Sequence, residues 1–195
     1  MKFLLDTNAI IPAEPTAVDD VETATPVVAE MLGLLARGRH EVFVHPDSVR
    51  EIGGDRRRER RELRLSLLTK YQTLPSPPVL PEALRVVLGR AAGTHDEVDR
   101  RLLASVLADA VDYLVTDDRG LHKKAARLGI GERVLAIGDA VAAVRALFES
   151  VGSVPPAVEK TYCYNLDLAD PIFDSLRSEY VDFDGWMRKC RLEHR

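Results

Sequence analysis

Carboxylates recur in this sequence where short apolar runs end. Asp6 directly follows one such run, residues 3–5, and Asp118 closely follows another, residues 113–115. Carboxylates held close together repel one another unless they are protonated or bridged by a cation. Oxygen donors of this kind suit hard ions, so the pattern favours Mg²⁺ or Mn²⁺. The carboxylates that we single out are Asp6, Glu51, Asp96, Asp99 and Asp118.

A scaffold must gather residues that lie this far apart. The apolar runs at 3–5, 42–44, 113–115 and 134–137 are typical of buried strands in a parallel sheet. Alternating with these strands, helical patterns cover 27–35, 56–68, 102–107, 118–128 and 139–148. Strands that alternate with helices predict an α/β fold with a central, mainly parallel sheet. In such folds ligand chemistry gathers at the carboxyl ends of the strands, where these acidic residues are expected.

The composition is that of a globular domain. Hydrophobic residues make up 46% of the 195 residues and charged residues 30%, and the formal net charge is −4. This negative average disfavours a protein that coats nucleic acid non-specifically. There is no apolar run of signal-peptide or membrane-span length, and Cys163 and Cys190 form no Cys-x-x-Cys pair. We therefore expect a cytoplasmic protein with reduced thiols and no membrane association.

Four acidic motifs, taken in order, resemble those of the PIN domain, a family of metal-dependent nucleases. Residues 3–8, Phe-Leu-Leu-Asp-Thr-Asn, resemble the opening of that family, and Glu51 lies where the family has its second acidic residue. Residues 99–104, Asp-Arg-Arg-Leu-Leu-Ala, resemble the third motif. Residues 113–118 resemble the last strand motif, in which a Thr is followed two residues later by an Asp. The resemblance covers roughly residues 1 to 148.

The resemblance implies a three-layer α/β/α fold over residues 1–150. It also implies an endoribonuclease that hydrolyses RNA phosphodiester bonds with Mg²⁺ or Mn²⁺, as in the toxins of toxin–antitoxin pairs. By this resemblance the catalytic residues are Asp6, Glu51, Asp99 and Asp118. The metal ligands are Asp6, Asp99 and Asp118, with Asp96, one helical turn before Asp99, as an additional ligand. The supporting residues are Asn8, Thr116 and Asp117.

Each motif also has an ordinary structural interpretation. An Asp after a strand commonly caps a helix, which applies to Asp6 and to the pair 117–118. Asp99 would then only favour the first turn of a helix, and Glu51 would be an exposed helical residue. The five histidines form no metal pattern, and we expect His45 and His95 in loops.

Two other functional classes deserve comparison with the nuclease. The first is a non-catalytic PIN-like scaffold or regulatory module that serves a fused or separate partner. The second is a haloacid-dehalogenase-like phosphatase, suggested by an Asp after the first strand. That chemistry needs a second Asp two residues later, where this sequence has Asn8, so the phosphatase ranks low.

The densest positive stretch, residues 56–64, has two interpretations. Such a run is usually a solvated helix face with internal ion pairs. On the rim of an acidic, metal-filled cleft, the same arginines would bind the phosphates that flank the cleaved bond. The predicted nucleic-acid-binding residues are Arg56, Arg57, Arg60, Arg61 and Lys123.

Residues 151–195 read as a linker and a helical tail. Asp170 followed by Pro171 is typical of a helix start. Phe183, Trp186 and Met187 share one face of a second short helix, and we expect that face to be buried. Residues 171–186 resemble the connector of PIN domains fused to a GNAT acetyltransferase. We therefore expect a missing C-terminal domain, with RNA as substrate, an antitoxin-like protein or fused acetyltransferase domain as partner, and a homodimer.

Overall fold

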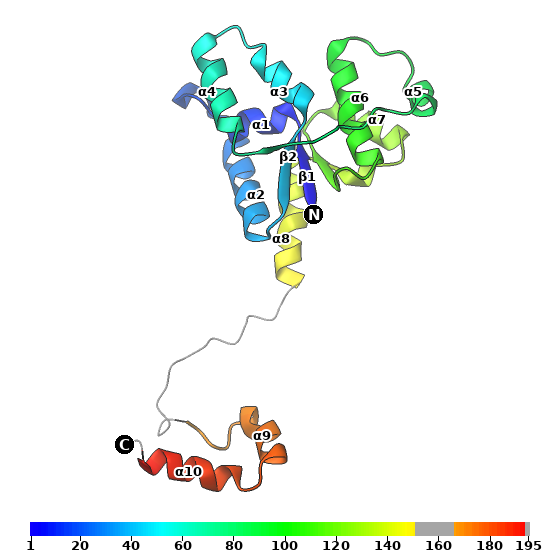
Figure 1. Ribbon diagram of the computed structural model, residues 1–195. Helices are drawn as coiled ribbons and strands as arrows, with labels where there is room; N and C mark the ends of the chain where they lie inside the picture. Colours follow the sequence, from blue (N-terminus) through cyan, green and yellow to red (C-terminus); the bar gives the residue numbers. More distant parts are fainter. Residues whose placement is uncertain (151–165, 194–195) are drawn as a thin grey trace. The chain divides into compact units, whose positions relative to one another are not determined.

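The computed structural model describes residues 1–150 and 166–193, in two units divided between residues 152 and 153 (Figure 1). The expected linker at 151–165, which contains Cys163, lies outside the described residues, as do residues 194 and 195. None of the helices in the described ranges combines the length and the apolar character that crossing a membrane requires.

The larger unit is built on a five-stranded parallel sheet of order β3-β2-β1-β4-β5. The strands are β1 Lys2–Leu5, β2 Glu41–Val44, β3 Gln72–Thr73, β4 Tyr113–Val115 and β5 Val134–Leu135. The central strand β1 pairs with both β2 and β4, and its last residue, Leu5, lies between Val44 and Val115. The prediction of an α/β fold with a parallel sheet is therefore confirmed.

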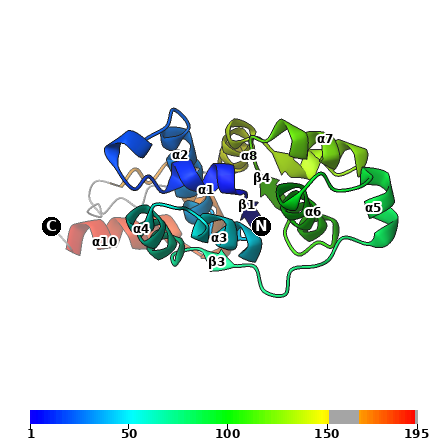
Figure 2. The same ribbon diagram turned by 90° about the horizontal axis from the view of Figure 1, so that it is seen from above.

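Helices cover both faces of this sheet, which gives three layers (Figure 2). Helices α2 and α8 pack together on one face, and α6 and α7 cover the other. The helices of this unit are α1 Thr7–Ala13, α2 Thr25–Arg37, α3 Pro46–Gly53, α4 Arg58–Leu68, α5 Glu82–Leu88, α6 Thr94–Leu107, α7 Arg119–Arg127 and α8 Ile137–Ser150.

The strands are apolar throughout because both of their faces are buried. In β1, Phe3 and Leu5 join the core under α2 and α8, whereas Leu4 joins the core under α6 and α7. All three side chains are almost completely buried. A strand that is covered on both sides reads as a continuous hydrophobic run rather than an alternating one, which is why β1 and β4 are visible in the sequence.

Several elements differ from the sequence-based expectation. The strand predicted at 134–137 ends at Leu135, because Ile137 already begins α8 and donates its N–H to the Asp117 carboxylate at 2.9 Å. Helix α4 begins at Arg58 rather than Arg56. Helices α1 and α5 and the two-residue edge strand β3 were not expected. In α1 the reason is Pro12, which lies inside the helix and removes a backbone donor.

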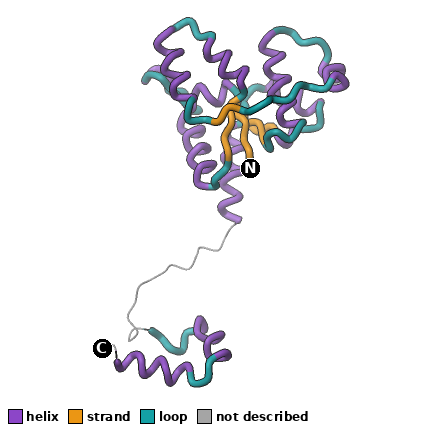
Figure 3. Tube along the Cα trace, in the orientation of Figure 1, coloured by secondary structure: helices purple, strands orange, loops and turns teal. Residues whose placement is uncertain are grey.

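The C-terminal unit contains the two expected helices (Figure 3). Asp170 caps the first of them, a short 3₁₀ turn at Pro171–Phe173 that leads into α9, Asp174–Glu179. The second is α10, Phe183–Glu193. Phe183 and Met187 on its face are buried, but Trp186 is 59% exposed, so the predicted burial holds for only two of the three positions.

The core beneath the site sets the stability of the larger unit. Leu4 is completely buried among the side chains of α6, α7 and β4. We expect Leu4→Ala to lower the free energy of unfolding by about 2–5 kcal/mol in urea denaturation, because it removes buried methyl groups and leaves a cavity. Val18→Ala, at a side chain that is 89% exposed, is the control and should change stability by about 0.5 kcal/mol at most. Equal effects of the two substitutions would contradict this account of the core.

Candidate active site

Asp6 lies where β1 ends and α1 begins, and its carboxylate is buried. One oxygen, Oδ1, accepts a hydrogen bond from the Thr7 backbone N–H at 2.7 Å and thereby caps α1. The other, Oδ2, accepts from the Thr116 hydroxyl at 2.8 Å. Because Thr116 follows β4, the pairing of β1 with β4 fixes this contact. The structural interpretation of Asp6 as a helix cap thus holds, and the same residue also stands at the carboxyl edge of the sheet.

The hydroxyl of Thr116 organises this edge. It is completely buried, and its single proton goes to Asp6. Its oxygen accepts from the side-chain amide of Asn8 at 2.9 Å and from the backbone N–H of Asp118 at 3.1 Å. The Asn8 side-chain oxygen in turn accepts the backbone N–H of Asp117 at 3.2 Å. Asn8 and Thr116 therefore hold the loop after β4 against the start of α1, in keeping with their predicted supporting role.

The pKa of Asp6 is raised to about 6. Loss of hydration is the largest cause, and the hydrogen bonds from Thr116 and the Thr7 N–H oppose it. The negative charges of Asp99 and Glu51 raise the pKa further. Burial therefore disfavours the ionised form of Asp6 in the folded protein. A cation bound next to this carboxylate would stabilise the ionised form.

Glu51, on α3, reaches the same edge from the opposite side of β1. Its Oε2 accepts a hydrogen bond from the Thr7 hydroxyl at 2.8 Å, next to Asp6 in the chain. Its Oε1 lies 2.7 Å from Nδ1 of His95, a residue in the first turn of α6. His95 is therefore not in a loop, as was expected, but in a helix, where it links α6 to α3. His45 lies, as expected, outside the helices and strands, in the connection from β2 to α3, where it is buried and caps α3.

Asp99 lies within α6 and is bound by Lys124 of α7, whose Nζ is 2.6 Å from its Oδ2. The same ammonium contacts Asp96. Burial raises the pKa of Asp99, and the bond from Lys124 only partly offsets this, while the charges of Asp118 and Asp96 add to it. Burial lowers the pKa of Lys124, but its two carboxylate partners more than compensate, so its pKa lies above the ordinary value and the ammonium stays charged.

Asp96 has partners at both of its carboxylate oxygens. Oδ1 contacts Lys124, and Oδ2 accepts from the Ala92 N–H at 3.1 Å and from Arg100 at 3.0 Å. Burial opposes ionisation, yet these partners hold the pKa of Asp96 below its usual value. Arg100 is buried and also binds the Gly89 carbonyl, which ties the start of α6 to the preceding loop. These contacts give Asp96 a positioning role at the start of α6, and its role as an additional metal ligand stays a prediction.

Asp118 and Asp117 diverge in their contacts. Asp118 caps α7, since its Oδ1 accepts the backbone N–H of Leu121 at 3.3 Å and also that of Gly120. Both capping bonds thus use the same oxygen of the carboxylate. Asp117 instead accepts the Ile137 N–H and so anchors the start of α8. Asp117 therefore supports the fold next to the site, whereas Asp118 belongs to the acidic cluster.

Four carboxylates from four separate elements thus come within electrostatic reach of one another. Asp6 is affected by the charges of Asp99 and Glu51, and Asp99 by the charge of Asp118. We call Asp6, Glu51, Asp99 and Asp118 the acidic cluster. Within residues 1–150 and 166–193, no group of three or more His, Cys, Asp or Glu side chains is arranged to hold a metal ion as it stands.

The donor set of the acidic cluster nevertheless fits a hard cation. Its ligands are all carboxylate oxygens, which Mg²⁺ and Mn²⁺ prefer. A positive charge already stands beside the cluster, because the ammonium of Lys124 bridges Asp96 and Asp99. Chemically, the arrangement can bind a cation and, through it, a phosphate. A divalent ion at Asp99 would have to compete with Lys124.

The arginine stretch divides into structural and exposed members. Arg60 binds the carboxylate of Asp55 through two nitrogens, at 2.5 and 2.9 Å, and Arg61 donates to the Asp55 carbonyl at 3.0 Å. Arg60 and Arg61 therefore fasten the turn before α4, as the ion-pair interpretation expected. The predicted phosphate-binding side chains that are exposed are those of Arg56, Arg57 and Lys123.

Lys124 and His95 are the site residues that sequence reasoning missed. Lys124 was not among the predicted site residues, and His95 was expected in a loop. Their partners, Asp99 and Glu51, are 25 and 44 positions away in the chain, and no local motif signals such pairs. Comparison with family models, with curated proteins and with solved structures finds no match to this chain. Function is therefore inferred from the site itself.

The raised pKa of Asp6 predicts a pH-dependent effect on stability in metal-free buffer. Between its ordinary pKa of 3.8 and its folded value of about 6, the folded state binds more protons than the unfolded state. The wild type therefore loses stability through Asp6 as the pH rises across this window. We expect Asp6→Asn to gain about 2 kcal/mol relative to wild type when urea denaturation is moved from about pH 4 to about pH 7. A difference between the two proteins that does not change with pH would contradict the burial effect.

Proposed function

We propose that this chain is a divalent-metal-dependent endoribonuclease with a PIN-like site, which hydrolyses phosphodiester bonds of RNA. The observation that carries the proposal is the convergence of Asp6, Glu51, Asp99 and Asp118 at the carboxyl edge of a parallel sheet. Ligand chemistry in parallel α/β folds concentrates at this edge. A convergent group of like charges, in which the pKa values of Asp6 and Asp99 are both raised, supports a cation-binding site better than a purely structural role.

The residues of the chain have distinct parts in such a site. Asp6, Asp99 and Asp118 would hold Mg²⁺ or Mn²⁺, with Glu51 beside them. The ion supplies activation of water and stabilisation of negative charge on the phosphate. Thr116 and the Thr7 N–H keep the Asp6 carboxylate in one orientation, so that little reorganisation is needed when the substrate arrives. Asn8 holds the loop that carries Asp118 in place.

One observation favours the second candidate, a non-catalytic PIN-like scaffold. The charge of Asp99 is already balanced by Lys124, as in a structural ion-pair network. In a scaffold the acidic cluster would stay as it is and bind no exchangeable ion. Mn²⁺ binding therefore separates the two functions.

The partners are proposed from the resemblance, and the cellular location from the lack of an apolar run of signal-peptide or membrane-span length in the sequence. We propose an RNA substrate, a cytoplasmic location and a homodimer. We further propose an antitoxin-like protein or a fused acetyltransferase domain as the protein partner. The exposed Trp186 in α10 is compatible with such a partner, because large aromatic side chains are favoured at protein interfaces.

The proposed nuclease function predicts that substitutions in the acidic cluster strongly reduce RNA cleavage. We expect Asp6→Asn and Asp118→Asn each to reduce Mn²⁺-dependent cleavage of a structured RNA pool by about a hundredfold or more, because each removes a charged ligand. Asp109→Asn is the matched control. Asp109 is exposed and has a φ of 54° that Asn also tolerates, so its cleavage rate should equal that of wild type. Unchanged cleavage in both cluster variants would reject the assignment.

A second prediction concerns Lys124. We expect Lys124→Met to bind Mn²⁺ about tenfold more tightly than wild type in a calorimetric titration, because the competing ammonium is gone and the cluster gains negative charge. Lys123→Met removes the same charge from the neighbouring exposed position of α7 and should change the affinity by about twofold at most. If Lys124→Met binds Mn²⁺ no better than Lys123→Met, Lys124 does not occupy a metal position.

A further inference from the structure

A cavity opens beside the acidic cluster, between α3 and the start of α6. Its volume is about 750 Å³, and its lining includes Arg50, Glu51, Thr94, His95 and Arg101. Glu51 belongs both to this lining and to the acidic cluster, where it is bonded to Thr7 beside Asp6. The cavity is therefore a direct neighbour of the proposed reaction centre.

Two arginines converge in this cavity on one buried carboxylate. Asp47, which is 6% exposed, contacts Arg50 through Oδ1 and Arg101 through Oδ2, the latter at 2.6 Å. The backbone of Asp47 is held as well, because its N–H donates to Nδ1 of His45 at 3.1 Å. The two guanidiniums therefore lie at adjacent oxygens of a single group, close enough to reach one ligand together. Their side chains are 74% and 48% exposed.

Most of the hydrogen-bonding groups in the cavity that still lack a protein partner are N–H donors of the two arginines. Each guanidinium contacts Asp47 through Nη1, which leaves most of its five N–H groups for a ligand. The acids of the lining are largely committed, because Asp47 holds the two arginines and Glu51 holds Thr7 and His95. Glu97 adds one further negative charge near Arg101. An acceptor with several oxygens, such as a phosphate, matches the planar N–H fork of arginine.

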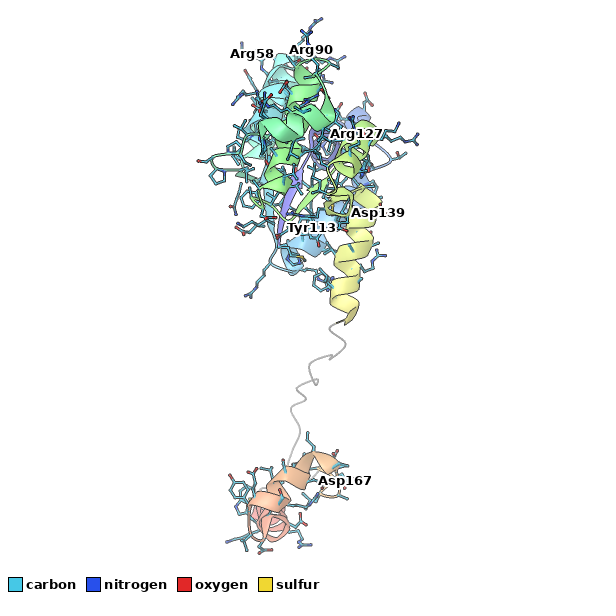
Figure 4. The ribbon with its side chains drawn as sticks, turned by 90° about the vertical axis from the view of Figure 1, so that its right-hand side faces the viewer. Arg58, Arg90, Tyr113, Arg127, Asp139 and Asp167 are labelled. Atoms are coloured by element: carbon cyan, nitrogen blue, oxygen red, sulfur yellow. The ribbon has the colours of Figure 1, made fainter. Side chains whose placement is uncertain are left out.

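We propose that this cavity binds one phosphate group of an RNA strand through Arg50 and Arg101, next to the phosphate that is cleaved at the acidic cluster. The inference rests on the proposed function and names a substrate contact for it. The proposal places the specific phosphate contact at α3 and α6 instead of α4. In α4, Arg60 and Arg61 are bonded to Asp55 in the preceding turn. Figure 4 shows Arg58 and Arg90 at the same end of the larger unit, where exposed arginines can add a weaker, non-specific attraction.

The test measures RNA binding without catalysis. Fluorescence anisotropy of a short labelled single-stranded RNA, in buffer with EDTA, compares wild type with Arg50→Gln, Arg101→Gln and the double variant. We expect the double variant to lose about tenfold in affinity, the effect of one charge-assisted contact. The slope of log affinity against log salt should fall by about 0.7, the value for one phosphate contact to a single strand. Arg58→Gln, at an arginine 80% exposed on α4, should weaken binding by about twofold at most.

Each outcome decides the matter. Circular dichroism checks that the double variant is folded. If it is not, the two single variants provide the test, because each of them leaves Asp47 paired with one guanidinium. Unchanged affinity in the arginine variants, an equal loss in Arg58→Gln, or no RNA binding by the wild type would overturn the proposal. Because the buffer holds no divalent ion, the result is separate from cleavage. RNA cleavage that depends on Asp6, together with unchanged binding by the Arg50 and Arg101 variants, would leave the nuclease standing and remove only this contact.

Discussion

A carboxylate forced out of water at the end of the central strand is the constraint around which this site is arranged. Asp6 is 8% exposed because β1 lies in the middle of the sheet, between β2 and β4. A charge in that place is tolerated only with close partners. The Thr7 N–H and the Thr116 hydroxyl supply them, and both are fixed by main-chain geometry rather than by long side chains.

The neighbouring carboxylates are stabilised by other means. Asp99 lies beside the ammonium of Lys124, Glu51 lies beside the imidazole of His95, and Asp118 sits at the N-terminus of α7, where the helix favours negative charge. Capping and ligand binding are thus compatible roles for Asp118, because a cap uses one oxygen. The capping interpretation and the proposed ligand role of Asp118 therefore do not exclude each other.

The strands other than β3 and the positions of the carboxylates were predictable because both depend on local patterns. A buried parallel strand is an unbroken apolar run; Asp6 follows such a run directly, and Asp118 follows another after two residues. The partners that balance their neighbours were not predictable in this way. Lys124 meets Asp99, and Arg101 meets Asp47, only because α7, α6 and α3 pack around one edge of the sheet. Long flexible cations can reach many acids, so sequence alone does not select among them.

The roles of the arginines were hard to predict for the same reason, because sequence alone does not show which acid each of them contacts. Their number in residues 56–64 suggested a surface for a polyanion, whereas the structure uses Arg60 and Arg61 to hold the turn at Asp55. The two arginines that converge on a cavity come from separate helices, α3 and α6, and form no run. If a phosphate binds where we propose, the convergence of two isolated charges marks its place and the charged run does not.

The strand order also determines when the site can form during synthesis of the chain. Asp6 and Thr116 are neighbours across the sheet but stand 110 residues apart in the chain. At ribosomal speeds of about 5–20 residues per second, about 5–20 seconds separate the synthesis of the two. Through that interval the first acidic motif is present without its partners. The edge that would act on RNA is completed only after β4 has emerged and inserted beside β1, so the ribosome and its message are not exposed to a finished site while most of the unit is being made.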